Sequence, residues 1–168
     1  KNIGKMISTK YYSTEYSDDL IGVDECAATK NIYSMLIGAS EGLSSNSLDN
    51  EIKHKYYLNT AASLAYKAVS EMKILTKKLN GKAETAYGLS GLGDLYVSSA
   101  GGRNSKMGYY LGQGHSFKEA KEKFMKDITV EGADLVFEIG PKILKEFDKK
   151  EFKLLISVIE SIYNNKKL

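Results

Sequence analysis

The chain has very little cysteine, histidine, tryptophan or proline, and these shortages exclude several kinds of protein. Among its 168 residues Cys26 is the only cysteine, so an intrachain disulfide framework is excluded and a reducing compartment, the cytoplasm, is expected. One cysteine and two histidines cannot supply the usual ligands of a zinc site, and no metal is predicted. The only proline is Pro141, so little in the sequence interrupts long helices.

Long hydrophobic runs and concentrated positive charge are also missing. The longest apolar stretch, around 154–159, is far too short to cross a bilayer, so no membrane insertion is expected. The net charge is +3, and no basic stripe carries interleaved aromatic residues, which argues against nucleic acid as a partner. No secretory signal is visible, although residue 1 is not methionine, so we expect the start of the parent chain to be missing.

What remains is a composition typical of one soluble domain, with 42% apolar and 27% charged residues. The segment 10–16 combines aromatic and β-branched residues before a Ser17-Asp18-Asp19 turn, which predicts one or two short strands. After residue 22 the apolar spacing is helical. The predicted helices cover about 23–41, a long stretch from 45–47 to 79, then 104–112, 116–125, 131–148 with an interruption or kink at Gly140-Pro141, and 151–164.

The long helix has an apolar seam that predicts burial against neighbouring helices. Its members step by threes and fours: Leu58, Ala61, Ala65, Ala68, Met72, Leu75 and Leu79. Between this helix and the next, residues 83–102 are rich in glycine and break the regularity. The sequence therefore predicts an all-α domain with a short β segment at its N-terminus, and its chemistry should lie at the glycine-rich interruption.

The first candidate site residues are Lys30 and Asn31. Lys30 lies one turn beyond Cys26 and Ala27, on a helix shoulder of small side chains where its amine could approach a ligand. Asn31, about 100° further around the helix, could hydrogen-bond the same ligand. A solvated lysine and an ordinary surface amide remain the alternatives.

The second candidate is the glycine-rich segment that ends in Asp94. Its spacing, Gly88-Leu-Ser-Gly-Leu-Gly-Asp94, resembles a dinucleotide-binding fingerprint only superficially, because no strand precedes it. The glycines more readily allow a close backbone approach that presents Asp94, which could pair with the Lys30 ammonium. Alternatively, Asp94 caps the short helix that follows it.

The third candidate is the turn Gly101-Gly102-Arg103-Asn104. Arg103 is the only arginine among 24 basic residues, and its rigid guanidinium can grip a phosphate or carboxylate at two points. It stands at a predicted helix start, where free backbone N–H groups also favour an anion. An arbitrary arginine in a surface turn is the alternative. Together the three candidates predict a site for a small phosphorylated substrate.

Several segments, in register, resemble the C-terminal domain of NAD(P)-dependent glycerol-3-phosphate dehydrogenase from about residue 8 to the end. They are Gly22-Val23, Ala28-Thr29-Lys30-Asn31, Gly88 to Leu95, Gly101 to Asn104 and Glu131-Gly132. The resemblance implies a helical substrate-binding domain over 23–168, of the 6-phosphogluconate dehydrogenase C-terminal-like type. It also implies that residues 1–22 are the last strands and linker of a preceding dinucleotide-binding domain.

The resemblance also implies roles for particular residues. Lys30 would exchange a proton with the substrate oxygen, and Asp94 would orient Lys30 and the substrate hydroxyls. The implied substrate-binding residues are Lys30, Asn31, Asp94, Gly102 through its backbone, Arg103 and Asn104, and the implied cofactor contacts are Arg103, Thr129 and Glu131. Glu25 and Thr29 depart from the family, because these places near the lysine are usually apolar.

The implied reaction is the reversible, NAD(P)H-dependent reduction of dihydroxyacetone phosphate to sn-glycerol 3-phosphate. NAD or NADP would be bound mainly by the domain that these 168 residues lack, so we expect the isolated chain not to oxidise NADH when given dihydroxyacetone phosphate. One alternative is the helical domain of another hydroxy-acid-type dehydrogenase. The other is a non-catalytic module in which the long alanine-rich helix forms a homodimer.

Overall fold

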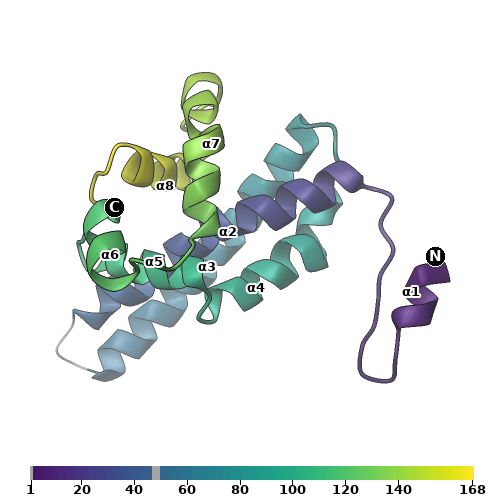
Figure 1. The fold of residues 1–168 in the computed structure, drawn as a ribbon, viewed down its shortest axis with the longest axis horizontal. Coiled ribbons are helices and arrows are strands. Elements are labelled where there is room, and N and C mark those ends of the chain that lie inside the picture. The colour runs from purple at the N-terminus through teal and green to yellow at the C-terminus, as the bar shows by residue number, and fades with distance from the viewer. Residues whose placement is uncertain (1, 47–49) are drawn as a thin grey trace.

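The computed structural model describes residues 2–46 and 50–168, and every regular element in these two ranges is a helix. The all-α class is therefore confirmed. In chain order the elements are α1 (Asn2–Ile7), α2 (Leu20–Ser45), α3 (Asn50–Lys78), η1 (Ala83–Tyr87), η2 (Leu89–Gly93), α4 (Asp94–Ser99), α5 (Arg103–Gly112), α6 (Phe117–Phe124), α7 (Glu131–Glu146) and α8 (Lys153–Tyr163). Figure 1 shows a helical body from which α1 and the N-terminal linker that follows it, residues 8–19, project.

The strands expected near the N-terminus are not formed, and that prediction was wrong. Residues 2–7 form α1, and residues 8–19 have no regular structure. A strand needs a hydrogen-bonded neighbour to be stable, and the described residues contain no sheet to supply one. The β-prone segment instead makes a local turn, in which the Thr9 N–H donates to the Tyr12 carbonyl at 2.8 Å.

Helix α2 runs through the body and packs against α3, α4, α5, α7 and α8. It begins three residues earlier than predicted, because Asp19 accepts the Gly22 N–H at 3.0 Å and caps the helix. The other carboxylate oxygen of Asp19 accepts the Lys82 N–H at 2.9 Å and the Thr85 hydroxyl at 2.5 Å. These hydrogen bonds, that of Thr85 foremost, lower the pKa of Asp19 and tie the start of α2 to η1.

Helices α2 and α5 are in contact through their backbones. A Cβ built on Gly108 would lie 1.8 Å from the Met35 carbonyl oxygen, and one on Gly38 would lie 2.0 Å from that of Ser105. Gly42 and Gly112 repeat these contacts one turn further along each helix. Only glycine allows so close an approach, so these four positions fix the distance between the two helices.

Within α3 the predicted seam is fully buried only in the C-terminal half, and its last member, Leu79, lies beyond the end of the helix. Ala68, Met72 and Leu75 are buried, whereas Leu58 is 51% exposed and Leu79 is 44% exposed. The buried half is the part that carries Glu71, whose carboxylate caps α8 by accepting the N–H groups of residues 154 and 155 at 2.9 and 3.0 Å. Helix α7 contains Pro141 without the expected interruption. Among the described residues, no helix combines the length and apolarity that crossing a membrane would require.

Candidate active site

Lys30 projects from α2 toward α4. Its Nζ lies 2.8 Å from Asp94 Oδ2 and donates a hydrogen bond of 2.9 Å to Ser98 Oγ. The Lys30 side chain is only 14% exposed, so it is not an ordinary solvated lysine. The predicted pairing of Lys30 with Asp94 is confirmed.

Asp94 is the first residue of α4, directly after the glycine-rich η2. The N-cap position of α4 is taken by Gly93, and the Asp94 side chain pairs with Lys30. The glycines before it allow close packing, since a Cβ on Gly91 would lie 2.3 Å from the Ala86 carbonyl oxygen. The capping alternative for Asp94 therefore does not describe the structure.

Ser98 is a site residue that the sequence analysis missed. It follows Asp94 by one helical turn, so both side chains project from the same side of α4 toward the Lys30 ammonium. The spacing of four residues between an acid and a hydroxyl was the available signal. This spacing identifies Ser98 as a partner of Lys30 only when Lys30 is known to approach this side of α4.

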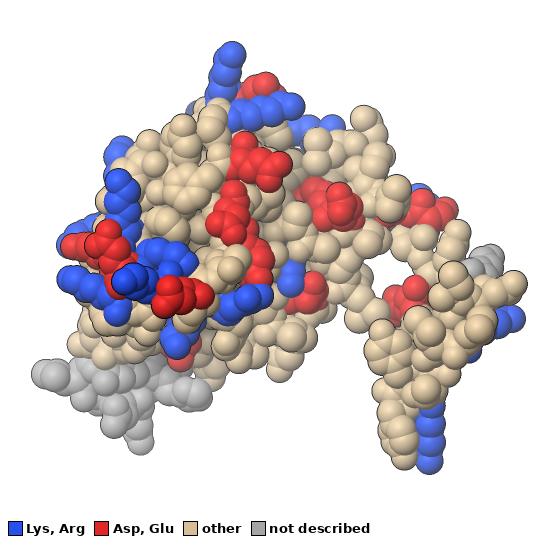
Figure 2. Space-filling model, viewed as in Figure 1, with Lys and Arg blue, Asp and Glu red and all other residues tan. Residues whose placement is uncertain are grey.

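Arg103 begins α5, as predicted, and its guanidinium forms an ion pair with Glu131 at the start of α7. The two side chains are 58% and 41% exposed, so a ligand from solvent can reach both. Both are predicted site residues, but no pattern in the sequence predicted their contact with each other. Figure 2 shows a band of acidic side chains down the middle of one face of the molecule, with basic side chains beside it.

Asn104 and Asn31 form the next layer of this cluster. The Asn104 side chain donates from Nδ2 to Asn31 Oδ1 at 3.1 Å and to Glu131 Oε2 at 3.4 Å. Its Oδ1 accepts the Gly132 backbone N–H at 2.8 Å. Asn31 and Asn104 are thereby brought together with Glu131, although they are separated by 73 residues in sequence.

Gly102 directly precedes α5, and its N–H donates to the Ser98 carbonyl at 3.3 Å. A Cβ at this position would lie 2.7 Å from that same carbonyl oxygen, which explains why the turn uses glycine. Gly101 before it has a φ of +121°, a conformation that other residues rarely adopt. Gly102 is therefore placed to offer backbone groups only, as expected.

Thr129 is not brought into this cluster. It is exposed and lines a different cleft, together with Lys121, Lys126 and Asp127. Within the described structure no hydrogen bond joins its side chain to Arg103 or Glu131. The structure thus gathers every predicted site residue except Thr129 along the side of α2 that faces α4, α5 and α7.

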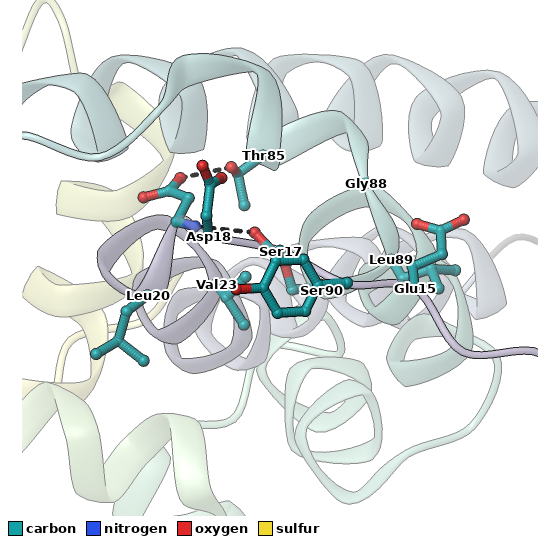
Figure 3. Close-up of a pocket in the computed structure, with 11 residues that line it drawn as sticks. Glu15, Ser17, Asp18, Leu20, Val23, Thr85, Gly88, Leu89 and Ser90 are labelled. Atoms are coloured by element: carbon teal, nitrogen blue, oxygen red, sulfur yellow. Dashed lines mark hydrogen bonds between the residues drawn. The ribbon is translucent and has the colours of Figure 1, made fainter. Parts of the chain in front are cut away.

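A cleft of about 740 Å³ lies where the N-terminal linker passes the start of α2. Figure 3 shows the side chain of Glu15 beside Leu89 at one end of the cleft and that of Asp18 near Thr85 at the other. The cleft is also lined by Val23, which precedes Lys30 by seven residues and so lies on the same face of α2. None of the predicted site residues lines this cleft, but it lies along the helix face that leads to Lys30.

The two departures near the lysine, Glu25 and Thr29, form one buried group. Glu25 is 8% exposed, and its carboxyl contacts the Thr29 hydroxyl at 2.9 Å as well as the hydroxyl of Thr76. No ion pair reaches Glu25 among the residues that the structure describes. Burial, only partly offset by these hydrogen bonds, raises the pKa of Glu25 above its ordinary value of 4.5.

This raised pKa predicts a pH dependence of stability. Above pH 4.5 the folded chain retains a proton on Glu25 that the unfolded chain has released, so stability is lost as pH rises through the folded pKa. Glu25→Gln removes this loss while keeping the shape of the side chain. We expect its melting temperature to rise relative to wild type as the pH increases from 4.5 toward 7. Glu84→Gln, at an exposed site in η1, is the matched control, and parallel profiles for wild type and Glu25→Gln would contradict the prediction.

Comparison with known proteins identifies the family of the chain. The model of the family described as NAD-dependent glycerol-3-phosphate dehydrogenase C-terminus matches residues 19–168. The NADP(+)-dependent glycerol-3-phosphate dehydrogenase of Archaeoglobus fulgidus is 34% identical over 98% of the chain and 47% of its own length. A glycerol-3-phosphate dehydrogenase [NAD(P)+] of Clostridium tetani is 32% identical over 93% of the chain and 39% of its own length.

Solved structures give the same result for the fold. The crystal structure of glycerol-3-phosphate dehydrogenase from Coxiella burnetii superposes with a TM-score of 0.78 at 27% identity, covering 99% of this chain and 47% of that one. The enzyme from Saccharomyces cerevisiae superposes with a TM-score of 0.79 at 22% identity, covering 97% and 44%, which supports the fold alone. The chain thus spans about half the length of the relatives it matches most fully. It belongs to the NAD-dependent glycerol-3-phosphate dehydrogenase family and contains the C-terminal domain of that family.

Proposed function

We propose that this chain is the substrate-binding and catalytic half of a glycerol-3-phosphate dehydrogenase. The reaction is the reversible, NAD(P)H-dependent reduction of dihydroxyacetone phosphate to sn-glycerol 3-phosphate. The observation that carries this proposal is the pair of neighbours Lys30 and Asn31 on α2. Lys30 contacts Asp94 and Ser98 on α4, whereas Asn31 contacts Asn104 on α5, beside Arg103. One helix therefore presents a proton donor and an anion-binding cluster side by side.

In this proposal Lys30 acts on the carbon-2 oxygen of the substrate. Its ammonium polarises the ketone and gives a proton to the oxygen as negative charge develops there, and its amine takes the proton back in the reverse direction. Asp94 and Ser98 hold the ammonium in place, and the half-exposed carboxylate of Asp94 can also accept a substrate hydroxyl. The hydride would come from the nicotinamide of an NAD(P)H that is bound mainly by another part of the enzyme.

The substrate phosphate is proposed to bind at the start of α5. The backbone N–H groups of the first turn, which includes Arg103 and Asn104, have no acceptor within the helix and point outward from its N-terminus. The Arg103 guanidinium lies beside them and can turn from Glu131 to a phosphate, because both side chains are exposed. Gly102 contributes through its backbone.

The described residues do not form a complete dinucleotide site. They contain no strand, so the strand, glycine turn and helix that bind a pyrophosphate in dinucleotide folds cannot be assembled from them. We propose that Arg103, Glu131 and Thr129 contact an NAD or NADP held mainly elsewhere. A cytoplasmic location and a homodimer belong to the same proposal.

Ligand titration tests this function against the hydroxy-acid alternative. We expect the chain to bind sn-glycerol 3-phosphate at least about tenfold more tightly than glycerol, which has no anionic group, or 3-hydroxybutyrate, whose carboxylate has one charge and two oxygens. The phosphate has more negative charge and a third oxygen, so it can engage Arg103 and the N–H groups at the start of α5 together. Arg103→Lys keeps the charge but should weaken phosphate binding about tenfold, whereas Lys106→Ala on the same helix should change it less than about twofold. Calorimetry measures all of these affinities. Equal or tighter binding of 3-hydroxybutyrate would support the hydroxy-acid reading instead.

A further inference from the structure

The Asn104 side chain has no free N–H donor left for a phosphate. The residue is 5% exposed, and its amide makes three hydrogen bonds, to Asn31, Glu131 and the Gly132 backbone. Both N–H groups of its Nδ2 and one of the two lone pairs of its Oδ1 are used in these bonds. A phosphate could bind this amide only by breaking one of them.

The Gly132 backbone determines how both asparagine amides are oriented. A backbone N–H can only donate, so the Asn104 atom that faces it at 2.8 Å must be the oxygen. The Asn104 nitrogen then faces Asn31, and because that nitrogen donates, the Asn31 atom opposite it must also be an oxygen. The Asn31 NH₂ group is left pointing away from Asn104, and Asn31 lines an open cleft of about 330 Å³ between α2 and α7.

The position of Gly132 is itself fixed. A Cβ on Gly132 would lie 2.8 Å from the Asn31 carbonyl oxygen and 2.7 Å from Met35 Cε, so the start of α7 rests directly on α2. The same Asn104 nitrogen also contacts Glu131, which pairs with Arg103. One buried amide thus connects three groups at the rim of the site: the α7 backbone, the Asn31 amide and the partner of Arg103.

We infer that Asn104 is a positioning residue. Its side chain bonds the α7 backbone on one side and the Asn31 amide on the other, and so holds the two N–H donors of Asn31 toward the substrate. Asn104 itself meets the phosphate through its backbone N–H at the start of α5. This inference rests on the proposed function and refines it, because it assigns direct side-chain contact to Asn31 and indirect action to Asn104.

A double-mutant cycle tests the inference with sn-glycerol 3-phosphate as the probe. Asn104→Ala should weaken binding about tenfold in the wild-type background, because the Asn31 amide loses its fixed orientation. In the Asn31→Ala background the same change should cost less than about twofold, because the residue through which Asn104 acts is gone. Equal losses in both backgrounds would show direct contact by Asn104 and overturn the inference. A lower melting temperature with unchanged affinity would also overturn it.

A measurement on the unmutated, ligand-free chain keeps the inference testable if Asn104→Ala fails to fold. In ¹⁵N-labelled protein the Asn104 side-chain NH₂ should be protected from hydrogen exchange, whereas the Asn31 NH₂ should exchange rapidly. The opposite pattern would refute the orientation argued above. The exchange measurement needs no ligand, so its outcome does not depend on the proposed function. The proposed function would itself fail if the wild-type chain did not bind sn-glycerol 3-phosphate.

Discussion

Replacing Lys30 with methionine is expected to lower kcat/KM by at least about 10³-fold, because the change removes both a proton donor and the positive charge that stabilises the developing alkoxide. The assay follows NADPH oxidation with dihydroxyacetone phosphate. It uses this chain joined to the N-terminal half of the Archaeoglobus fulgidus relative, with which it shares 34% identity. The KM should change much less, because the proposed phosphate site lies at the start of α5 and does not include Lys30.

Lys142→Met is the matched control for this prediction. Lys142 is exposed on α7, so the same chemical change there should leave kcat/KM within about twofold of the parent enzyme. If Lys30→Met also left the activity unchanged, the lysine would have no part in the chemistry. The reading of the chain as a non-catalytic assembly module would then be favoured.

Gly108→Ala is expected to destabilise the fold by about 3 kcal/mol or more, although alanine at an ordinary helical site stabilises by about 1 kcal/mol. The added methyl would lie 1.8 Å from the Met35 carbonyl oxygen, and neither backbone can move without separating α2 from α5. Urea unfolding of the chain, followed by circular dichroism, measures the loss.

Gly93→Ala provides the comparison for this substitution. Gly93 has helical φ and ψ, and its new Cβ would have Leu89 Cδ2 at 3.4 Å as its nearest neighbour, so this variant should be as stable as wild type or more stable by up to about 1 kcal/mol. If Gly108→Ala were as stable as Gly93→Ala, the backbone contact between α2 and α5 would not exist in solution. The relative placement of Asn31 and Asn104 would then need another explanation.

The sequence predicted the helices well and the site in part, and the difference has a physical cause. Apolar spacing is a local signal, and so is Ser116 at the start of the predicted helix 116–125, where its side chain caps α6. Asp19 starts α2 early through a local bond to the Gly22 N–H, which is a signal that the sequence offered, but its other partners Lys82 and Thr85 are more than 60 residues away. No local pattern announces such a contact.

The same reasoning explains the failures. The segment 10–16 has strand propensity, but propensity alone cannot supply the neighbouring strand that would make use of it. Conversely, Gly38 and Gly42 on α2, and Gly108 and Gly112 on α5, each repeat at a spacing of four residues, a pattern that indicates close helix contact. That pattern was visible in the sequence, but only the structure shows that the two pairs face each other.

Because Lys30 and Asn31 are adjacent on a helix, their directions differ by about 100°, and each meets a different wall of the site. Removing one residue between the Asp19 cap and Lys30 would turn everything after it by this angle and bring Asn31 to the place of the amine. The same deletion would shift Gly38 away from Ser105 and set a bulkier neighbour against that carbonyl. Natural length variation in this family should therefore be confined to the loops, with the number of residues from 19 to 42 held constant.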